Sequence, residues 1–382
     1  MVCEKLFEKI DELSDEYLDV LEDICLIESP TDDKAAVDKC AEYFIGFAKK
    51  KGWKYEVFTE SVSGDIVTLI LNPDAKKAPV AMSAHLDTVH PIGLFKEPVV
   101  WRDEENMYGP GVLDCKGGAA AALLAMDALE RVGFTDRPIL LILQSDEEKG
   151  STPSSKRTIN HICERAKDSV AFLNAEGYGK HKLTLTRKGI LRFIIKVHGK
   201  AVHSAKCFEG KSAILEASHK IIELEKIKEK DGTTYNCGVI SGGTVANTVA
   251  EECEFTVDIR YNTNADGEAA KKRVEEIAAT SFIGGTTSEA IVISERPAME
   301  PCEKNNALFD KANEIFRKNG IPEVIKNHGL GGSDAAYTTL AGIPTLDSIG
   351  VEGDRGHSVE ESMVLSSLGE CAKRMGAIIY CI

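Results

Sequence analysis

The stretch PVAMSAHLDTVH, residues 79–90, places a histidine and an aspartate directly after an apolar run. The run from Val80 to Ala84 predicts a buried strand of a mostly parallel sheet. Because alternate residues of a strand face the same way, His85 and Asp87 are expected on one side of its carboxyl end, where open α/β sheets place ligands. A carboxylate that binds one ring nitrogen of a histidine orients the other toward a metal. The pair fits a metal ligand with its support, although plain surface residues also occur at strand ends.

Side chains that bind metals recur after other predicted strands and in two loops. The buried run PILLIL at 138–143 is followed by two glutamates, the short strand at 170–173 is followed by a third, and the glycine-rich loop at 109–118 contains an aspartate. A loop at 350–358 adds a second histidine. Oxygen and imidazole ligands without thiolate favour Zn²⁺, and to a lesser degree Mn²⁺ or Co²⁺. These further candidates are Asp114, Glu147, Glu148, Glu176 and His357.

The number of candidate ligands favours two metal ions over one. Two ions about 3.5–4 Å apart need a bridging carboxylate and terminal ligands for each. One histidine and one carboxylate per ion, with a shared aspartate, leave one of the adjacent Glu147 and Glu148 unused. A carboxylate held off the metals can serve as the general base that deprotonates water.

Each segment also has an ordinary structural explanation. Glu147 and Glu148 fit a solvated loop. The glycine-rich loop before Asp114 fits a phosphate cradle, although it lacks the Gly-Lys-Ser/Thr ending of a P-loop. Cys115 fits either an additional ligand or a packing thiol. The metal hypothesis therefore rests on all these positions together.

The bulk composition describes an ordinary globular protein and disfavours some partners. A formal net charge of -15 argues against nucleic acid and anionic membranes, which bind basic surfaces. No apolar run approaches the ~18 residues of a membrane span, and the acidic segment MVCEKLFEKIDELSDEY does not have the pattern of a signal peptide. The 11 cysteines include no C-x-x-C pair, which predicts reduced thiols in a cytoplasmic protein.

The order of the expected elements divides the 382 residues into two domains. Strands that alternate with helices up to residue 187 predict a doubly wound, mostly parallel α/β sheet. From 188 to 298 the order becomes βαββαβ, the ferredoxin-like split unit, which is complete in itself. The α/β pattern then resumes. We therefore predict a discontinuous domain, 1–187 and 299–382, interrupted by a smaller domain at 188–298.

Seven motifs follow one another over nearly the whole chain. They are HLDTV at 85–89, GPGVLDCKGG at 109–118, SDEEKGS at 145–151, GKAVHSA at 199–205, ANTVAEECEFTVDIRY at 246–261, GLGGSDAAY at 329–337 and GHS at 356–358. Together they resemble the dinuclear zinc peptidases, a family that includes glutamate carboxypeptidase, aminoacylase and succinyl-diaminopimelate desuccinylase. The likeness is strongest to bacterial glutamate carboxypeptidase. It implies the zinc-peptidase type of α/β sheet, with the smaller domain as a lid and often a homodimer interface.

The resemblance implies a role for each candidate ligand. His85 and Glu176 correspond to the terminal ligands of one zinc ion. Glu148 and His357 correspond to those of the second ion, and Asp114 corresponds to the bridge.

It also implies roles for residues beside the ligands. Glu147 corresponds to the general base, and Asp87 to the carboxylate that orients His85. The peptide bond between Asp114 and Cys115 is expected to be cis.

In the smaller domain, the resemblance implies that His203 polarises the scissile carbonyl, within its own chain or across a dimer. Asn247, Arg260 and Arg296 correspond to groups that hold the free carboxylate of a substrate, which the planar fork of arginine binds bidentately. A surface loop position explains His203 without any such role, and a structural salt bridge explains Arg260.

These assignments predict a zinc-dependent exopeptidase, foremost a carboxypeptidase that hydrolyses the amide bond to a C-terminal amino acid such as glutamate. Its substrates would be small peptides or N-acyl amino acids. An N-acyl-amino-acid deacylase or a dipeptidase of the same family remains an alternative, because the same metals serve all three. A metal-binding protein without activity is a further alternative, against which Glu147 and His203 argue.

Overall fold

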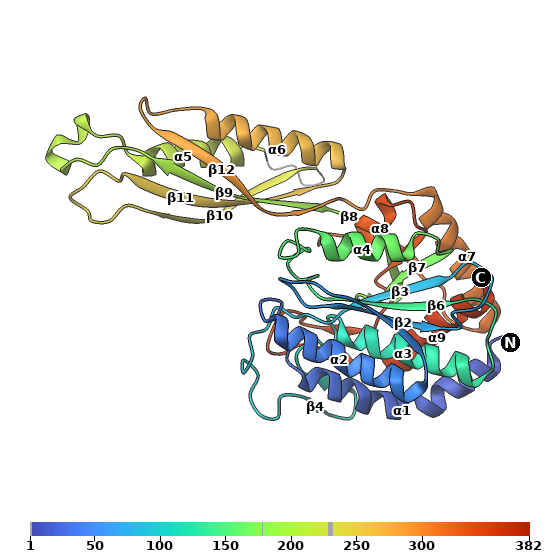
Figure 1. Ribbon diagram of the computed structural model, residues 1–382. Helices are drawn as coiled ribbons and strands as arrows, with labels where there is room; N and C mark the ends of the chain where they lie inside the picture. Colours follow the sequence, from blue (N-terminus) through green and yellow to red (C-terminus); the bar gives the residue numbers. More distant parts are fainter. Residues whose placement is uncertain (1, 178, 228–231) are drawn as a thin grey trace. The chain divides into compact units, whose positions relative to one another are not determined.

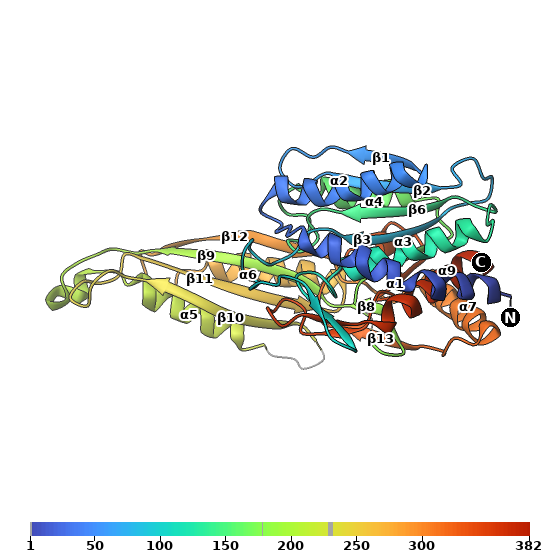
Figure 2. The same cartoon turned by 90° about the horizontal axis from the view of Figure 1, so that it is seen from below.

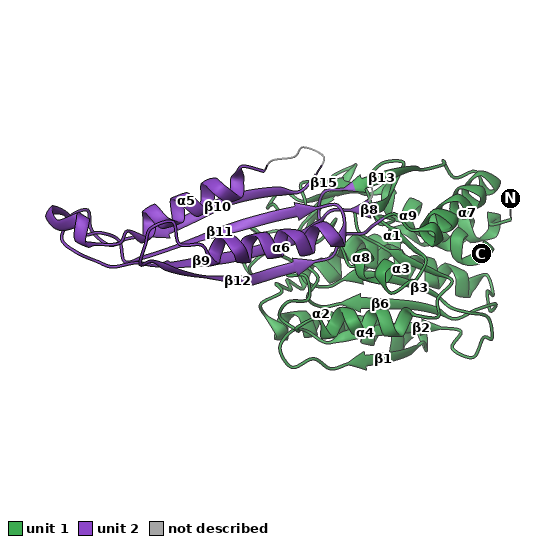
Figure 3. Ribbon diagram, turned by 90° about the horizontal axis from the view of Figure 1, so that it is seen from above, with its two compact units in different colours: residues 1–185, 301–328, 333–382 green, residues 186–300, 329–332 purple. Residues whose placement is uncertain are grey.

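The computed structural model describes residues 2–177, 179–227 and 232–382 (Figure 1). These residues form two compact units, drawn in different colours in Figure 3. Unit 1 comprises the chain up to Leu185 together with Pro301–His328 and Ser333–Ile382. Unit 2 comprises Thr186–Glu300 and Gly329–Gly332. Unit 2 is thus an insertion in unit 1, for which the sequence predicts the boundaries 188–298.

Unit 1 is built on an eight-stranded sheet, whose central strands β6, β3, β7 and β14 run parallel. The outer pairs β1–β2, β2–β6 and β14–β8 are antiparallel. Figure 2 shows β1, β2, β6 and β3 in this order. The predicted α/β class with a mostly parallel sheet is confirmed. In sheet order the strands are β1 (Lys54–Phe58), β2 (Ile66–Leu71), β6 (Ile139–Gln144), β3 (Val80–His85), β7 (Ala171–Asn174), β14 (Thr345–Asp347), β8 (Lys182–Arg187) and β13 (Ile325–Gly329).

Helices cover both faces of this sheet, which explains why its strands are continuous apolar runs. Alternate residues of β6 enter different cores: Leu141 belongs to one cluster, Leu140 and Ile142 to the other. Figure 1 shows α1, α2, α3 and α9 on one side of the sheet and α4 and α8 on the other. The helices of unit 1 are α1 (Glu4–Leu26), α2 (Lys34–Lys51), α3 (Lys116–Arg131), α4 (Arg157–Ala166), α7 (Glu303–Asn319), α8 (Ala335–Leu340) and α9 (Ser366–Cys381).

Helix α3 is the central helix of the larger core, because nearly all its residues are buried. Its alanines and glycines allow the close approach that this position requires, since a Cβ on Gly118 would lie 2.1 Å from the carbonyl oxygen of Ala175. The sequence predicts that this helix spans residues 119–132, whereas in the structure the helix begins at Lys116. The side chain of Lys116 is buried and donates a hydrogen bond to the carbonyl oxygen of Ile27 at 2.7 Å.

A second, small antiparallel sheet in unit 1 has the order β15-β16-β5-β4. Ser362 pairs with Tyr108, which brings the loop after β5 beside the loop between β15 and β16. Sequence periodicity cannot reveal strands of two or three residues. These strands are β4 (Trp101–Arg102), β5 (Asn106–Tyr108), β15 (Gly353–Asp354) and β16 (Ser362–Val364).

Unit 2 has the predicted βαββαβ order, with all neighbouring strands antiparallel in the order β10-β11-β9-β12. This is the ferredoxin-like split arrangement. Its core joins alternate residues of the strands to the buried sides of α5 and α6, for example Phe193 and Phe255 with Ala217 and Val274. The elements are β9 (Gly189–His198), the 3₁₀ helix η1 (Ser204–Glu209), α5 (Ala213–Glu225), β10 (Thr234–Gly242), β11 (Glu252–Tyr261), α6 (Asn264–Ala279) and β12 (Thr287–Arg296).

Among the described residues, none of the helices combines the length and the apolarity that crossing a membrane requires.

Candidate metal centre

The parallel register of unit 1 delivers three predicted ligands to one edge of the sheet. His85 is the last residue of β3 and pairs with Gln144, the last residue of β6. The turn after β6 therefore carries Glu148 to the edge at which β3 ends. Strand β7 is parallel to β3 as well, and Glu176 follows it.

The two remaining ligands come from loops that the small sheet holds together. Asp114 lies in the loop between β5 and α3, and His357 lies in the loop between β15 and β16. Both residues lie in loops, as the sequence predicts. The peptide bond between Asp114 and Cys115 is cis, as predicted.

The carboxylate of Asp114 lies between two histidines. Its Oδ1 is 2.9 Å from Nε2 of His85, and its Oδ2 is 3.0 Å from Nε2 of His357. Each oxygen of one carboxylate thus faces a different imidazole. A carboxylate that bridges two ions has this arrangement.

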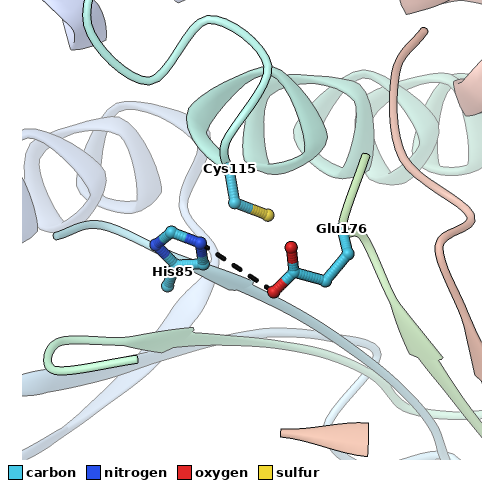
Figure 4. Close-up of side chains that lie close together, drawn as sticks. All are labelled: His85, Cys115 and Glu176. Atoms are coloured by element: carbon cyan, nitrogen blue, oxygen red, sulfur yellow. Dashed lines mark ion pairs between the residues drawn. The ribbon is translucent and has the colours of Figure 1, made fainter. Parts of the chain in front are cut away.

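Each histidine also faces one glutamate. Nε2 of His357 is 3.1 Å from Oε2 of Glu148. Nε2 of His85 is 3.9 Å from Oε1 of Glu176, and Figure 4 shows the two side chains pointing toward each other. The structure thus brings all five predicted ligands together, with one histidine and one glutamate on each side of Asp114. This donor set of imidazole and carboxylate fits a pair of divalent cations.

Cys115 lies beside His85 and Glu176 (Figure 4), close enough that the three side chains could hold one metal ion. Its Sγ donates a hydrogen bond to the carbonyl oxygen of Ala175 at 3.1 Å, and the residue is fully buried. Burial raises the pKa of this thiol well above its ordinary value. The side chain is therefore held as a neutral thiol that supports the segment carrying Glu176.

The carboxylates of the cluster repel one another, and burial increases the effect. Burial raises the pKa of Glu148 to about 7. Burial and the neighbouring Asp114 raise the pKa of Glu176 well above its ordinary value. Hydrogen bonds to Asp114 and Glu148 raise the pKa of His357 to about 11. These shifts show an excess of negative charge that divalent cations would neutralise, with release of the bound protons.

Asp87 supports both the first histidine and the adjacent glutamates. Its Oδ1 and Oδ2 accept hydrogen bonds from the backbone N–H groups of Glu147 and Glu148, each at 3.1 Å, and Oδ2 also accepts one from Thr31 at 2.8 Å. Nδ1 of His85 lies 2.8 Å from the backbone oxygen of Asp87 and 3.5 Å from its carboxylate. Asp87 thus orients His85 mainly through its carbonyl group, and its carboxylate fixes the turn after β6.

Glu147, the predicted general base, is in the same turn and is 6% exposed. Burial is the main cause of the raised pKa values of Glu148 and Glu176, and the charge of Glu147 adds to both. Glu147 belongs to neither of the two histidine–glutamate pairs around Asp114.

Glu361 is a residue of this site that sequence reasoning missed. Its carboxylate is buried, and Oε1 accepts hydrogen bonds from the backbone N–H groups of Leu113 and Asp114, both at 2.9 Å. Its Oε2 accepts one from Gly111 at 3.3 Å and lies 3.1 Å from Nε2 of His90. The segment SVEES has the composition of a solvated loop, and its closeness to His357 is the one signal that could have identified Glu361.

The other predicted residues lie in unit 2. His203 is exposed and precedes η1, where its Nδ1 accepts a hydrogen bond from the backbone N–H of Ala205 at 3.2 Å. The backbone N–H of Ser204, the residue after His203, donates to the carbonyl oxygen of Asn247 at 2.8 Å. The structure therefore holds the segments of His203 and Asn247 side by side.

The two arginines that the resemblance assigns to substrate binding differ in exposure. Arg260 is partly exposed and its Nε lies 2.6 Å from Oδ1 of Asp258 on the same strand. Arg296, the last residue of β12, is 7% exposed.

Comparison with known proteins agrees with this geometry. The model of "Peptidase family M20/M25/M40" matches residues 81–380. Carboxypeptidase G2 from Pseudomonas sp. (strain RS-16) is 29% identical over 361 residues, which are 92% of this chain and 86% of that protein.

Two solved structures share the fold. A tripeptidase from Staphylococcus aureus superposes with a TM-score of 0.78 at 21% identity and covers 96% of this chain and 98% of its own. The YXEP protein of Bacillus subtilis, described as a dinuclear metal binding peptidase, has a TM-score of 0.69 at 13% identity and covers 97% and 98%. The chain therefore belongs to peptidase family M20/M25/M40 and is a metallopeptidase.

Proposed function

We propose that the chain is a dinuclear zinc exopeptidase that hydrolyses the amide bond to a C-terminal amino acid. The observation that carries this proposal is the Asp114 carboxylate, whose two oxygens face His85 and His357 at 2.9 and 3.0 Å. The likeness to carboxypeptidase G2 over most of both chains supports the carboxypeptidase assignment.

Zinc ions held by His85, Glu176, Asp114, Glu148 and His357 would supply positive charge to the scissile carbonyl and make water easier to deprotonate. Glu147 takes the proton from that water and later returns it to the leaving nitrogen. Its backbone N–H is bound by Asp87, which holds the turn that carries both Glu147 and the ligand Glu148.

The substrate is oriented by residues of unit 2. His203, exposed at the start of η1, donates a hydrogen bond to the oxygen on which negative charge develops. Asn247, Arg260 and Arg296 bind the free carboxylate of the C-terminal amino acid. For Arg260 this requires that the substrate carboxylate bind the terminal nitrogens of the guanidinium, one of which donates to Asp258 together with Nε.

A panel of substrates tests the proposal. The protein loaded with zinc is incubated with N-acyl glutamates, other N-acyl amino acids, dipeptides and tripeptides, and the released amino acids are identified by mass spectrometry. The Glu147→Gln variant under the same conditions is the control for contaminating peptidases. Release of the C-terminal residue of tripeptides that depends on Glu147 supports the proposal, and release of their N-terminal residue contradicts it.

The same panel separates two related activities. A deacylase would cleave N-acyl amino acids but leave peptides intact, and a dipeptidase would cleave dipeptides only. Relatives and structural neighbours include a succinyl-diaminopimelate desuccinylase from Rickettsia rickettsii and the tripeptidase. Glutamate is the first C-terminal residue to examine because of the resemblance noted from the motifs.

Two further expectations belong to this proposal. All 11 cysteines are free thiols, which supports a location in a reducing compartment such as the cytoplasm. Strand β12 is an edge strand of the unit 2 sheet, and its Ile291, Val292 and Ile293 are each 38% exposed. This exposed aliphatic segment supports a homodimer formed through unit 2, which light scattering after size-exclusion chromatography would test.

A further inference from the structure

Two cysteines that are 378 positions apart in sequence lie in contact. Sγ of Cys3, directly before α1, is 3.5 Å from Sγ of Cys381, the last residue of α9. Both helices pack on the same face of the main sheet and contribute to one core. Figure 1 shows the two ends of the chain close together in unit 1.

Asn319, at the end of α7, fixes this pair of cysteines. Its Oδ1 accepts a hydrogen bond from the backbone N–H of Cys3 at 2.9 Å. Its Nδ2 lies 4.0 Å from Sγ of Cys381 and donates to the carbonyl oxygen of Ile315 at 2.9 Å. Because Asn319 is only 2% exposed, one rigid side chain positions both partners.

The two thiols have different environments. Cys3 is 1% exposed, whereas Cys381 is partly exposed. The hydrogen bond from Cys3 lowers the pKa of Cys381 to about 7, and the nearby Lys311 and Lys318 act in the same direction. The same contact raises the pKa of Cys3. Cys381 is therefore the accessible thiolate, and Cys3 is the buried thiol that can react with it after oxidation.

We propose that Cys3 and Cys381 are a redox-sensitive pair that a peroxide converts into an intramolecular disulfide. The Cys381 thiolate attacks one oxygen of hydrogen peroxide, which breaks the O–O bond and gives a sulfenic acid and hydroxide. The sulfur of Cys3 then attacks the sulfur of Cys381, and the sulfenic hydroxyl leaves as water with the Cys3 proton. In sum, two thiols and one peroxide give one disulfide and two waters.

The bond would connect the start of α1 directly to the end of α9. A cross-link between residues so far apart in sequence restricts the unfolded chain strongly. Oxidation would thus stabilise unit 1 without touching the metal centre, since neither cysteine is among its ligands or their supports.

Peptide mapping tests this inference on the full chain. The protein is treated with hydrogen peroxide, remaining thiols are alkylated, and the protein is digested with trypsin without reduction. We expect a disulfide that joins residues 1–5 to residues 375–382, and a melting temperature at least about 3 °C above that of the reduced protein. Alkylation of both cysteines after treatment, or a disulfide from Cys381 to any other cysteine, would overturn the proposal.

Single variants give a second readout. In Cys3→Ser, the Cys381 sulfenic acid has no partner thiol, so dimedone should label Cys381 after peroxide treatment. In the control Cys163→Ser, which changes a partly buried thiol on α4, the linked peptide should form as in the unmodified protein. Absence of dimedone label on Cys381 in Cys3→Ser would contradict the order of steps. If Cys3→Ser does not fold, the peptide map of the unmodified chain decides the proposal alone.

Discussion

The carboxylate of Glu361 accepts a hydrogen bond from the backbone N–H of Asp114, with 2.9 Å between Oε1 and the nitrogen. The same carboxylate binds the N–H groups of Leu113 and Gly111, so it fixes the loop that presents the proposed bridging ligand. Glu361 reaches Asp114 through the small sheet, in which β16 pairs with β5. It is a positioning residue, because it acts on the metal centre only through the backbone of Asp114.

Glu361→Gln should weaken metal binding more than it weakens the fold. An amide oxygen accepts fewer and weaker hydrogen bonds than a carboxylate, so the loop of Asp114 loses its fixed position. We expect the zinc dissociation constant to rise about 10- to 100-fold, the effect of losing a support of a metal ligand. Competition with a chromogenic chelator measures this constant.

The neighbouring Glu360 provides the matched control. It is exposed and pairs with Arg355, so Glu360→Gln should leave the zinc dissociation constant unchanged. Equal losses in the two variants would show that Glu361 has no special role in positioning Asp114.

Glu147→Gln should slow turnover strongly while leaving metal binding intact. Glu147 lies outside the two histidine–glutamate pairs, and loss of a general base slows the reaction about 10²- to 10⁴-fold. Steady-state kinetics together with zinc content from elemental analysis check both parts. A variant that lost zinc as well would instead identify Glu147 as a ligand.

Asp114→Asn should reduce the bound zinc from two ions to fewer than one per chain. The amide offers one oxygen and no charge, so it cannot face both histidines as the carboxylate does. Glu148→Gln and Glu176→Gln should each lose one ion, because each glutamate faces a single histidine. Elemental analysis after gel filtration measures the stoichiometry. Full occupancy by two ions in Asp114→Asn would refute the bridge.

Removal of the metals should be reversible. Dialysis against a chelator should abolish turnover, and added Zn²⁺ should restore it, with Mn²⁺ or Co²⁺ restoring part of it. Retained turnover after complete removal of metal would contradict a metal-dependent mechanism.

The buried carboxylate of Glu60 forms an ion pair with the exposed side chain of Arg157. The guanidinium donates to both carboxylate oxygens, from Nε at 2.8 Å and from one terminal nitrogen at 2.7 Å. The backbone N–H groups of Ser61 and Val62 add two more hydrogen bonds. The hydrogen bonds from Arg157, followed by those of the backbone, lower the pKa of Glu60 from 4.5 to about 2.

Arg157→Met should lower the free energy of unfolding, because it removes the charged partner of the buried Glu60 carboxylate and leaves it only the hydrogen bonds within its own loop. Urea denaturation at neutral pH measures this loss. Arg131→Met is a useful comparison: Arg131 also pairs with a buried carboxylate, Asp127, but Lys51 and Tyr17 remain as its partners. Arg131→Met should therefore lower the free energy of unfolding less than Arg157→Met does.

The ion pair between Glu60 and Arg157 predicts that stability depends on pH. The ionised form of Glu60 is favoured in the folded protein, so its contribution to stability is present above pH 4.5 and decreases as the pH falls toward 2. The difference in stability between the unmodified protein and Glu60→Gln should therefore be constant at neutral pH and shrink below pH 4.5. A difference in stability that increased at low pH would contradict this prediction.

Sequence patterns predict those strands and helices that can be recognised within a single segment of the chain. The runs at 80–84 and 139–143 are almost entirely apolar because both faces of their strands are buried. The alternation of strands and helices predicts the parallel sheet. The five ligands were found because the motifs name them. The roles of His203, Asn247, Arg260 and Arg296 stay predictions.

Other features depend on pairings between distant residues, which no local pattern reveals. The small sheet joins residues 106–108 to 362–364, and without it neither the position of His357 beside Asp114 nor the role of Glu361 can be foreseen. The start of α3 at Lys116 depends likewise on a buried lysine that binds the carbonyl group of Ile27.

Local patterns are enough to predict the apolar strands, the βαββαβ insertion and the residue types that suit a metal pair. They do not predict that the oxygens of Asp114 face two different histidines or that Cys3 lies against Cys381. Periodicity reflects which side of one element is buried, whereas distances between side chains arise when several elements pack together.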